Sequence, residues 1–255
     1  MRTTLFALLI GLIAGLTGGL FGVGGGLVAV PGLVLIIKLA QHNAHATSVT
    51  AIVAIASAAV IPFALDRELD WGVAMFLVAG AVIGAVLGAA LMGRINEATL
   101  AGAFVGLNVL AGIRLLMMSN VSAQAVFATD GAIGAMLLVA TGLLAGTLAA
   151  LLGVGGGLVF VPALVVLFGF DQHLAQGTSL AAIVPTTLVA SIRHAGQGRV
   201  IWNLVFPVAA GGIAGGLLGA GLALELAPLS LRRLFVGLLV IVSIRMVART
   251  RRDQT

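Results

Sequence analysis

The sequence contains no cysteine and few charged residues, and these absences limit what the protein can be. Without cysteine there is no disulfide, no thiolate metal site and no cysteine nucleophile. Charged residues make up 8% of the 255 residues, whereas a soluble domain carries about a quarter. Hydrophobic residues make up 61%, and the mean hydropathy is +1.23. This composition excludes a soluble domain and predicts an all-α, polytopic membrane helix bundle.

Histidine and acidic residues are also scarce, which argues against catalysis. The four histidines form no HxxxH or HExxH pattern, so we predict no metal site and no cofactor. The eight acidic residues stand mostly at the ends of apolar segments, so no carboxylate pair and no enzyme activity is expected. The net charge of +5 arises at segment ends and in the carboxyl-terminal tail. That placement fits anchoring on the cytoplasmic side better than binding of nucleic acid.

What the sequence does contain is the same glycine-rich peptide twice. Residues 22–31 read GVGGGLVAVP, and residues 153–162, 131 positions later, read GVGGGLVFVP. This recurrence predicts two tandem homologous membrane repeats, 1–118 and 131–255, joined by a linker at 119–130, with a short basic tail at the end. Paired and similarly interrupted hydrophobic segments are typical of transporters that bind their substrate between two halves.

The apolar runs predict about 8–10 membrane segments, since a span needs about 20 apolar residues. The runs at 26–40 and 157–170 are short, so each is either a tilted span or a broken, re-entrant helix. The first form gives ten crossings and inverted repeats, and the second gives eight crossings and parallel repeats. Opposite charges on equivalent loops favour inversion, whereas Arg232-Arg233 argues against it, and both forms place both chain ends in the cytoplasm. The runs are 4–21, 26–40, 47–65, 72–93, 99–117, 132–152, 157–170, 177–195, 202–224 and 230–248.

The first of these runs could be read as a cleaved signal peptide, because one Arg precedes an apolar stretch. Residues 11–15 (GLIAG), however, match 142–146 (GLLAG) in the second repeat, where no signal peptide can occur. We therefore expect the first run to be a retained membrane helix.

The consecutive glycines are expected to interrupt a helix in each repeat and to free backbone groups. Inside a membrane such groups must face protein or a water-filled cavity, and amino termini of helices favour anions. A tight turn would explain one copy, but two matched copies favour binding. Pro31, Pro162 and Pro185 are expected to add structural irregularities. The predicted substrate-binding glycines are Gly22, Gly24, Gly25 and Gly26 in one repeat and Gly153, Gly155, Gly156 and Gly157 in the other.

Hydroxyl and basic side chains supply further candidates for anion binding. The pairs Thr47-Ser48 and Thr178-Ser179 are expected to open helices, where they act as N-caps or donate to the bound oxyanion. Arg193-His194 has no counterpart in the first half. It is a candidate for receiving the anion or relaying a proton, unless Arg193 only snorkels to the interface.

Other polar and small residues are expected to have structural roles. His42 and His173 are interpreted as solvated loop residues, and Asn108 as a weak candidate for a hydrogen bond between helices. Two series of glycines spaced four apart predict close helix–helix packing, namely Gly80, Gly84 and Gly88, and Gly211, Gly215 and Gly219.

The duplicated GxGGGxxxxP element, each copy followed by a Thr-Ser pair, resembles the sulfite exporter TauE/SafE family, also called TSUP permeases. The resemblance covers about residues 5–248. It implies a permease of the bacterial inner membrane for sulfite or related small anions such as organosulfonates, sulfoacetate or thiosulfate. The family's motif positions correspond here to Gly22, Gly24, Gly25, Gly26, Pro31, Gly153, Gly155, Gly156, Gly157 and Pro162.

Our leading hypothesis is therefore a secondary transporter of small anions that alternates access around a midplane site between the repeats. A proton or ion gradient, or the substrate gradient itself, would drive it. The alternatives are a non-transporting accessory subunit of a larger membrane complex, and an intramembrane enzyme, for which paired titratable groups are missing. The sequence leaves the substrate, the direction of transport and the oligomeric state open.

Overall fold

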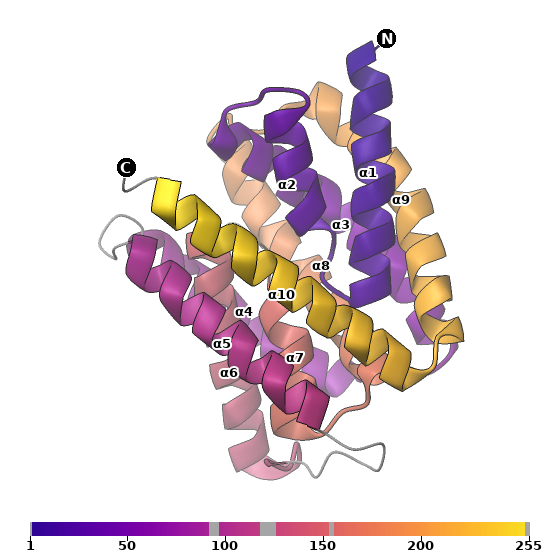
Figure 1. Ribbon diagram of the computed structural model, residues 1–255, viewed down its shortest axis with the longest axis vertical. Helices are drawn as coiled ribbons and strands as arrows, with labels where there is room; N and C mark the ends of the chain where they lie inside the picture. The colour runs from indigo at the N-terminus through magenta and orange to yellow at the C-terminus, as the bar shows by residue number, and fades with distance from the viewer. Residues whose placement is uncertain (1, 92–96, 118–125, 153–155, 253–255) are drawn as a thin grey trace.

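The computed structural model describes residues 2–91, 97–117, 126–152 and 156–252, and these residues form ten helices and no strand (Figure 1). The predicted all-α class is therefore confirmed. The first five helices are α1 (Arg2–Phe21), α2 (Gly26–Leu35), α3 (Gln41–Leu65), α4 (Trp71–Leu91) and α5 (Glu97–Met117). The next five are α6 (Gly131–Leu152), α7 (Gly157–Phe168), α8 (Gln172–Gly196), α9 (Trp202–Glu225) and α10 (Pro228–Arg252).

Six of these helices are long and apolar enough to cross a membrane: α1, α3, α4, α6, α8 and α9. The chain is thus a multi-pass membrane protein. The helices α2 and α7 have 10 and 12 residues, about 15 and 18 Å at 1.5 Å per residue, whereas the hydrocarbon core is about 30 Å thick. Neither can cross it alone.

The short helix α2 returns along the helix that precedes it. Gly25 packs against the carbonyl group of Ala14, and Gly32 packs against Ile10, so residue numbers rise along α2 while they fall along α1. Of the two forms predicted for the segment 26–40, the broken and returning helix therefore describes α2. Figure 1 shows α1 and α2 running past each other in opposite directions.

Directions of the longer helices follow from which residues touch. α1 and α9 run parallel, since Gly11 packs on Val208 and Gly19 packs on Gly216. α4 and α6 also run parallel, whereas α3 and α8 are antiparallel, since Thr50 meets Ser191 near one end and Phe63 meets Gly177 near the other.

Equivalent helices of the two halves consequently point in opposite directions. α3 begins beside the start of α9, where Thr47 binds the amide of Ile201, and α8 begins beside the start of α4, where Thr178 binds the amide of Asp70. Because α3 and α8 are antiparallel, α4 and α9 start at opposite ends of this pair. These directions favour the inverted arrangement over the parallel one, so the expected link between a returning segment and parallel repeats does not hold. The division into two repeats with a linker at 119–130 stays a prediction.

Glycines allow close packing within the two parallel helix pairs, α1–α9 and α4–α6, as the four-residue spacing predicts. A Cβ atom on Gly211, Gly215 or Gly219 of α9 would overlap a backbone carbonyl oxygen of α1. A Cβ atom on Gly80, Gly84 or Gly88 of α4 would meet α6 in the same way, at positions shifted by 131 residues. Removing the side chain lets the backbones approach, which replaces the missing hydrophobic force between helices in lipid. The predicted packing role of these glycines is confirmed.

This packing predicts that stability falls when one glycine of α9 is replaced by alanine and stays unchanged when another is replaced. Gly215→Ala should push α9 away from the carbonyl oxygen of Leu12 and cost about 1–3 kcal/mol, as overpacking of a tight core does. Gly221→Ala is the matched control, because nothing lies within 4 Å of its Cβ position. The measurement is thermal unfolding in detergent, and equal melting temperatures for the two variants would contradict the packing described here.

Candidate functional site

The first glycine break forms because three residues adopt left-handed backbone conformations. Gly22, Gly24 and Gly25 have φ values of 70°, 77° and 88°, which residues with a Cβ atom rarely adopt. α1 ends at Phe21, and the amide of Val23 donates to the carbonyl oxygen of Gly18 at 3.1 Å, the pattern of a Schellman cap. The chain then reverses and α2 begins at Gly26.

Two backbone N–H groups of this break have no hydrogen-bond acceptor among the described residues. Residues 22–26 are all buried, and the amides of Gly24 and Gly25 donate to no acceptor in the part of the chain that the structure describes. Buried amides without a partner are rare because each one forfeits its hydrogen bond to water. Among the described residues nothing accepts these two amide hydrogens, so this part of the structure leaves them available to a further acceptor.

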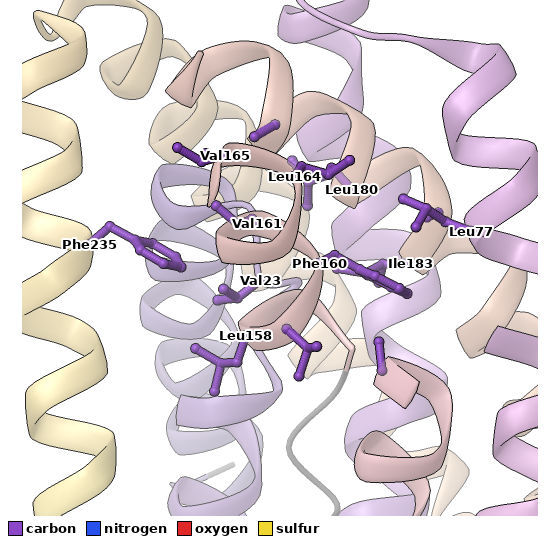
Figure 2. Close-up of a cluster of buried hydrophobic side chains, with 14 of the residues drawn as sticks. Val23, Leu77, Leu158, Phe160, Val161, Leu164, Val165, Leu180, Ile183 and Phe235 are labelled. Atoms are coloured by element: carbon purple, nitrogen blue, oxygen red, sulfur yellow. The ribbon is translucent and has the colours of Figure 1, made fainter. Parts of the chain in front are cut away.

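The second half of the chain supplies the surroundings of the first break. Ser179 Oγ donates to the carbonyl oxygen of Gly22 at 2.8 Å. Gln176, one turn earlier on α8, lies against Gly22, where a Cβ atom would be 2.7 Å from its Cα atom. Gly157 of the second break packs directly on Val23. Figure 2 shows Val23 beside Leu158 and Val161 of α7.

The break lies where α3 and α8, the two central helices, cross. A Cβ atom on Gly24 would be 3.2 Å from Ile52 of α3 and 3.1 Å from Ile183 of α8. These isoleucines occupy equivalent positions of the two halves, 131 residues apart. The structure thus places Gly22, Gly24, Gly157 and Ser179, all predicted from the sequence, around one point between the halves.

The other predicted glycines are described only in part. Gly25 and Gly26 belong to the same buried break, and Gly156 adopts right-handed helical angles, with φ −69° and ψ −21°, unlike Gly25. Gly153 and Gly155 lie outside the described residues. Pro31, Pro162 and Pro185 lie inside α2, α7 and α8, and each helix continues past its proline.

The prediction that the Thr-Ser pairs open helices is wrong. α3 begins at Gln41 and α8 at Gln172, where Asp171 Oδ1 accepts from the amide of Leu174 at 2.9 Å and caps the helix. The short polar stretch before each Thr-Ser pair forms the first turns of a helix and not a loop. His42 and His173, predicted to be solvated loop residues, are also in these first turns.

Thr47 and Thr178 instead accept hydrogen bonds from backbone amides in the opposite half of the chain. Thr178 Oγ1 accepts from the amide of Asp70 at 3.0 Å, and Thr47 Oγ1 accepts from the amide of Ile201 at 3.1 Å. Asp70 and Ile201 directly precede α4 and α9 and are themselves 131 residues apart. Each threonine therefore fixes the start of a helix across the interface.

Arg193 and His194 are not at the glycine break. They stand 14 and 15 residues after Ser179 on the same helix, more than about 20 Å away at 1.5 Å per residue. Arg193 is exposed, and His194 is half-buried against His45. His173, predicted to be a solvated loop residue, is partly buried, and its Nε2 atom lies 2.9 Å from the carbonyl oxygen of Ala223.

Sequence reasoning missed the buried amides of α8. Gln176 is 0% exposed and Gln172 is 3% exposed, and the side-chain amide of each has no hydrogen-bond partner among the described residues. Both lie on the same helix face as Ser179, which leads to the break. The signal available in the sequence was a pair of polar, uncharged side chains, Gln172 and Gln176, spaced four residues apart in an otherwise apolar helix. Asn108 is also buried, and its side chain has no hydrogen-bond partner within the described ranges, so the predicted interhelical hydrogen bond is not found there.

Charges gather differently at the two ends of the α3–α8 pair. The end where α8 begins, called the acidic end, includes Asp66, Glu68, Asp70 and Asp171. Burial raises the pKa of Glu68, and the negative charge of Asp171 raises it further. The opposite end, where α3 begins, is called the basic end and includes Lys38, Arg193 and Arg199. Among the described residues no group of three metal-ligating side chains is found.

The threonine contacts predict a cost that differs between two similar substitutions in α8. Thr178→Val removes the acceptor of the Asp70 amide, and a buried donor left unpaired costs about 1–3 kcal/mol. Thr186→Val is the control, because Thr186 donates only to carbonyl oxygens of its own helix. Thermal unfolding in detergent should show a clearly lower melting temperature for Thr178→Val. Equal losses in the two variants would show that the cross-half bond has no special weight.

Comparison with known proteins agrees with this architecture. The family model of the sulfite exporter TauE/SafE matches residues 7–246. A probable membrane transporter protein of Bacillus subtilis, YunE, is 27% identical over 234 residues, which cover 84% of this chain and 86% of the relative. A probable membrane transporter protein of Xylella fastidiosa is 28% identical over 241 residues, which cover 93% and 92%. The chain therefore belongs to the sulfite exporter TauE/SafE family of membrane transporters.

Proposed function

We propose that this protein is a secondary transporter of small anions, with sulfite or a related sulfur oxyanion or organosulfonate as its substrate. The observation that carries the proposal is the buried break at Gly24 and Gly25, whose amides have no acceptor among the described residues. Backbone amides are strong donors to anionic oxygen, most of all where water is excluded. The match to the sulfite exporter family supports the choice of anion, and no catalytic role is assigned.

The substrate would lie between the amides of the break and the side chain of Gln176. This side chain brings two N–H donors and no charge, so it would bind an oxyanion without requiring a counter-ion. Ser48 adds a buried hydroxyl group without a partner. Its equivalent, Ser179, is engaged with Gly22, so the two halves would contribute unequally.

Alternating access is supported by two equivalent polar faces that lead to this point from opposite ends. On α8 the face carries Gln172, Gln176 and Ser179, and on α3 it carries Gln41, His45 and Ser48. Residues at these spacings share one side of a helix. Because α3 and α8 are antiparallel, the α8 face leads to the acidic end and the α3 face leads to the basic end.

Exposure differs between the two faces in the described conformation. The α8 face is buried along its whole length, whereas on the α3 face Gln41 is exposed, His45 is half-buried and Ser48 is buried. We infer a state that is closed toward the acidic end and partly open toward the basic end. Rocking of one half against the other around Ile52 and Ile183 would exchange the two states.

The positive-inside rule places the basic end in the cytoplasm. α1 and α9 both begin at this end, since they run parallel and Thr47 binds the residue before α9. α10 ends in the same upper half of Figure 1 in which α1 begins. We therefore propose cytoplasmic chain ends and a location in the bacterial inner membrane, with transport driven by an ion gradient or by the substrate gradient.

The proposal is tested by uptake of labelled sulfite into liposomes that contain the purified protein. Gln176→Leu keeps the size of the side chain but removes its donors. Because a hydrogen bond to a charged group contributes about 1.5–3 kcal/mol, the KM for sulfite should rise by roughly 10- to 150-fold. Asn108→Leu is the control, since Asn108 is another buried and unpartnered amide but lies on α5.

Sulfate, chloride and an organosulfonate as competitors would define the substrate class. Competition by organosulfonates alone would shift the substrate away from sulfite and leave the anion site in place. No protein-dependent uptake of any of these anions, or equal KM values for Gln176→Leu and the wild-type protein, would contradict the proposed binding site.

A further inference from the structure

Two histidines from the two halves face each other at the basic end. The ring centroids of His45 on α3 and His194 on α8 are 5.5 Å apart, and the ring planes meet at 86°. Both side chains are half-buried, and His194 Nδ1 is shielded from solvent with no hydrogen-bond partner in the described part of the chain. The pair therefore bridges the two central helices, directly beside the polar face of α3.

Basic residues stand at the end of the protein where the pair lies. Arg199 lies in the turn after α8, where its amide donates to the carbonyl oxygen of His194 at 3.2 Å. α9, which begins at this end, contains no titratable side chain before Glu225. The other basic or titratable residues on the elements that begin or end here include Arg2 at the start of α1, Lys38 in the α2–α3 connection, His42 on α3 and Arg193 on α8. Arg199 brings a positive charge close to His194.

The equivalent place at the acidic end cannot bind a proton. The residues 131 positions away are Gln176 for His45 and Phe63 for His194. Phe63 occupies the matching location, since a Cβ atom on Gly177, next to Gln176, would be 2.9 Å from the Cβ atom of Phe63. Of these two equivalent positions, one on each side of the α3–α8 pair, the one at the basic end thus carries two histidines and the one at the acidic end carries Gln176 and Phe63.

Protonation would change the packing of this pair. Neutral imidazole rings pack edge to face, as observed, whereas a charged ring in a half-buried contact loses hydration and is repelled by a neighbouring cation. Imidazole gains its proton between about pH 8 and pH 5. A protonated pair therefore favours separation of α3 from α8 at the basic end, where water reaches the rings.

We propose that His45 and His194 form a proton-binding site that opens the α3 face toward the basic end when it is protonated. The inference rests on the proposed function, because the opened face leads to the anion site at Gly24. It identifies the proton as the ion that is coupled to anion movement, and it places that coupling at one end of the protein.

A thiol reporter tests the opening without any transport measurement. The chain has no cysteine, so a single Thr50→Cys substitution can be labelled specifically. Thr50 Oγ1 accepts from Ser191 Oγ at 3.0 Å, between α3 and α8 and near the histidines. The maleimide labelling rate at position 50 is divided by the rate of an exposed reference, Asp66→Cys, to remove the intrinsic pH dependence of thiols.

Lowering the pH from about 8 to about 5.5 raises the proton occupancy of an ordinary imidazole by roughly a factor of 30. The relative labelling rate at position 50 should rise severalfold over this range. It should become independent of pH in His45→Gln and His194→Phe, in which each histidine is replaced by the residue that the other half carries. His42→Gln, which removes an exposed histidine one turn away, should keep the full pH response.

Sulfite uptake by the same variants separates this inference from the proposed function. pH-dependent labelling without any uptake would support the proton site and contradict sulfite transport. Uptake with a relative labelling rate that is constant with pH in the wild-type protein, or that changes equally in His45→Gln, would overturn the proton site and leave the transporter intact. Uptake that loses its pH dependence in both histidine variants but not in His42→Gln would support both.

Discussion

The arrangement of the bundle around its centre depends on a buried helix break. Three left-handed glycines end α1 and turn the chain back into α2, and among the described residues the amides of Gly24 and Gly25 have no acceptor. In a membrane interior an unpaired amide is costly, so such a break persists only where something else accepts its hydrogens. Ser179 and Gln176 of the second half lie against the break, and in the proposed function they complete an anion site there.

The remaining contacts keep that crossing in place while allowing it to move. Thr47 and Thr178 tie the start of each central helix to the opposite half, and the glycine-lined pairs α1–α9 and α4–α6 each join one helix from each half. Near the break each central helix presents an aliphatic side chain to Gly24, Ile52 from α3 and Ile183 from α8. Aliphatic contacts have no fixed geometry, which is compatible with the proposed tilting of the two halves.

Sequence patterns predicted the helical membrane fold, the glycine break and the tight glycine packing, because each depends on composition or on residues close together in the chain. The start of α3 and α8 was misplaced, because a polar first turn such as Gln41-His42 resembles a loop when hydropathy alone is considered. The partner of Ser179 could not be predicted, since Gly22 lies 157 residues away. Arg193 was predicted as a candidate ligand because its charge is visible in the sequence, whereas its distance from the break depends on how the chain folds.

The most direct test of the central claim is an experimental structure of the protein in lipid nanodiscs, determined with and without sulfite. The account predicts density in the presence of sulfite alone, within hydrogen-bonding distance of the amides of Gly24 and Gly25 and of the side-chain amide of Gln176. Density beside Arg193 instead, or a break that stays dry and unchanged at saturating sulfite, would contradict it.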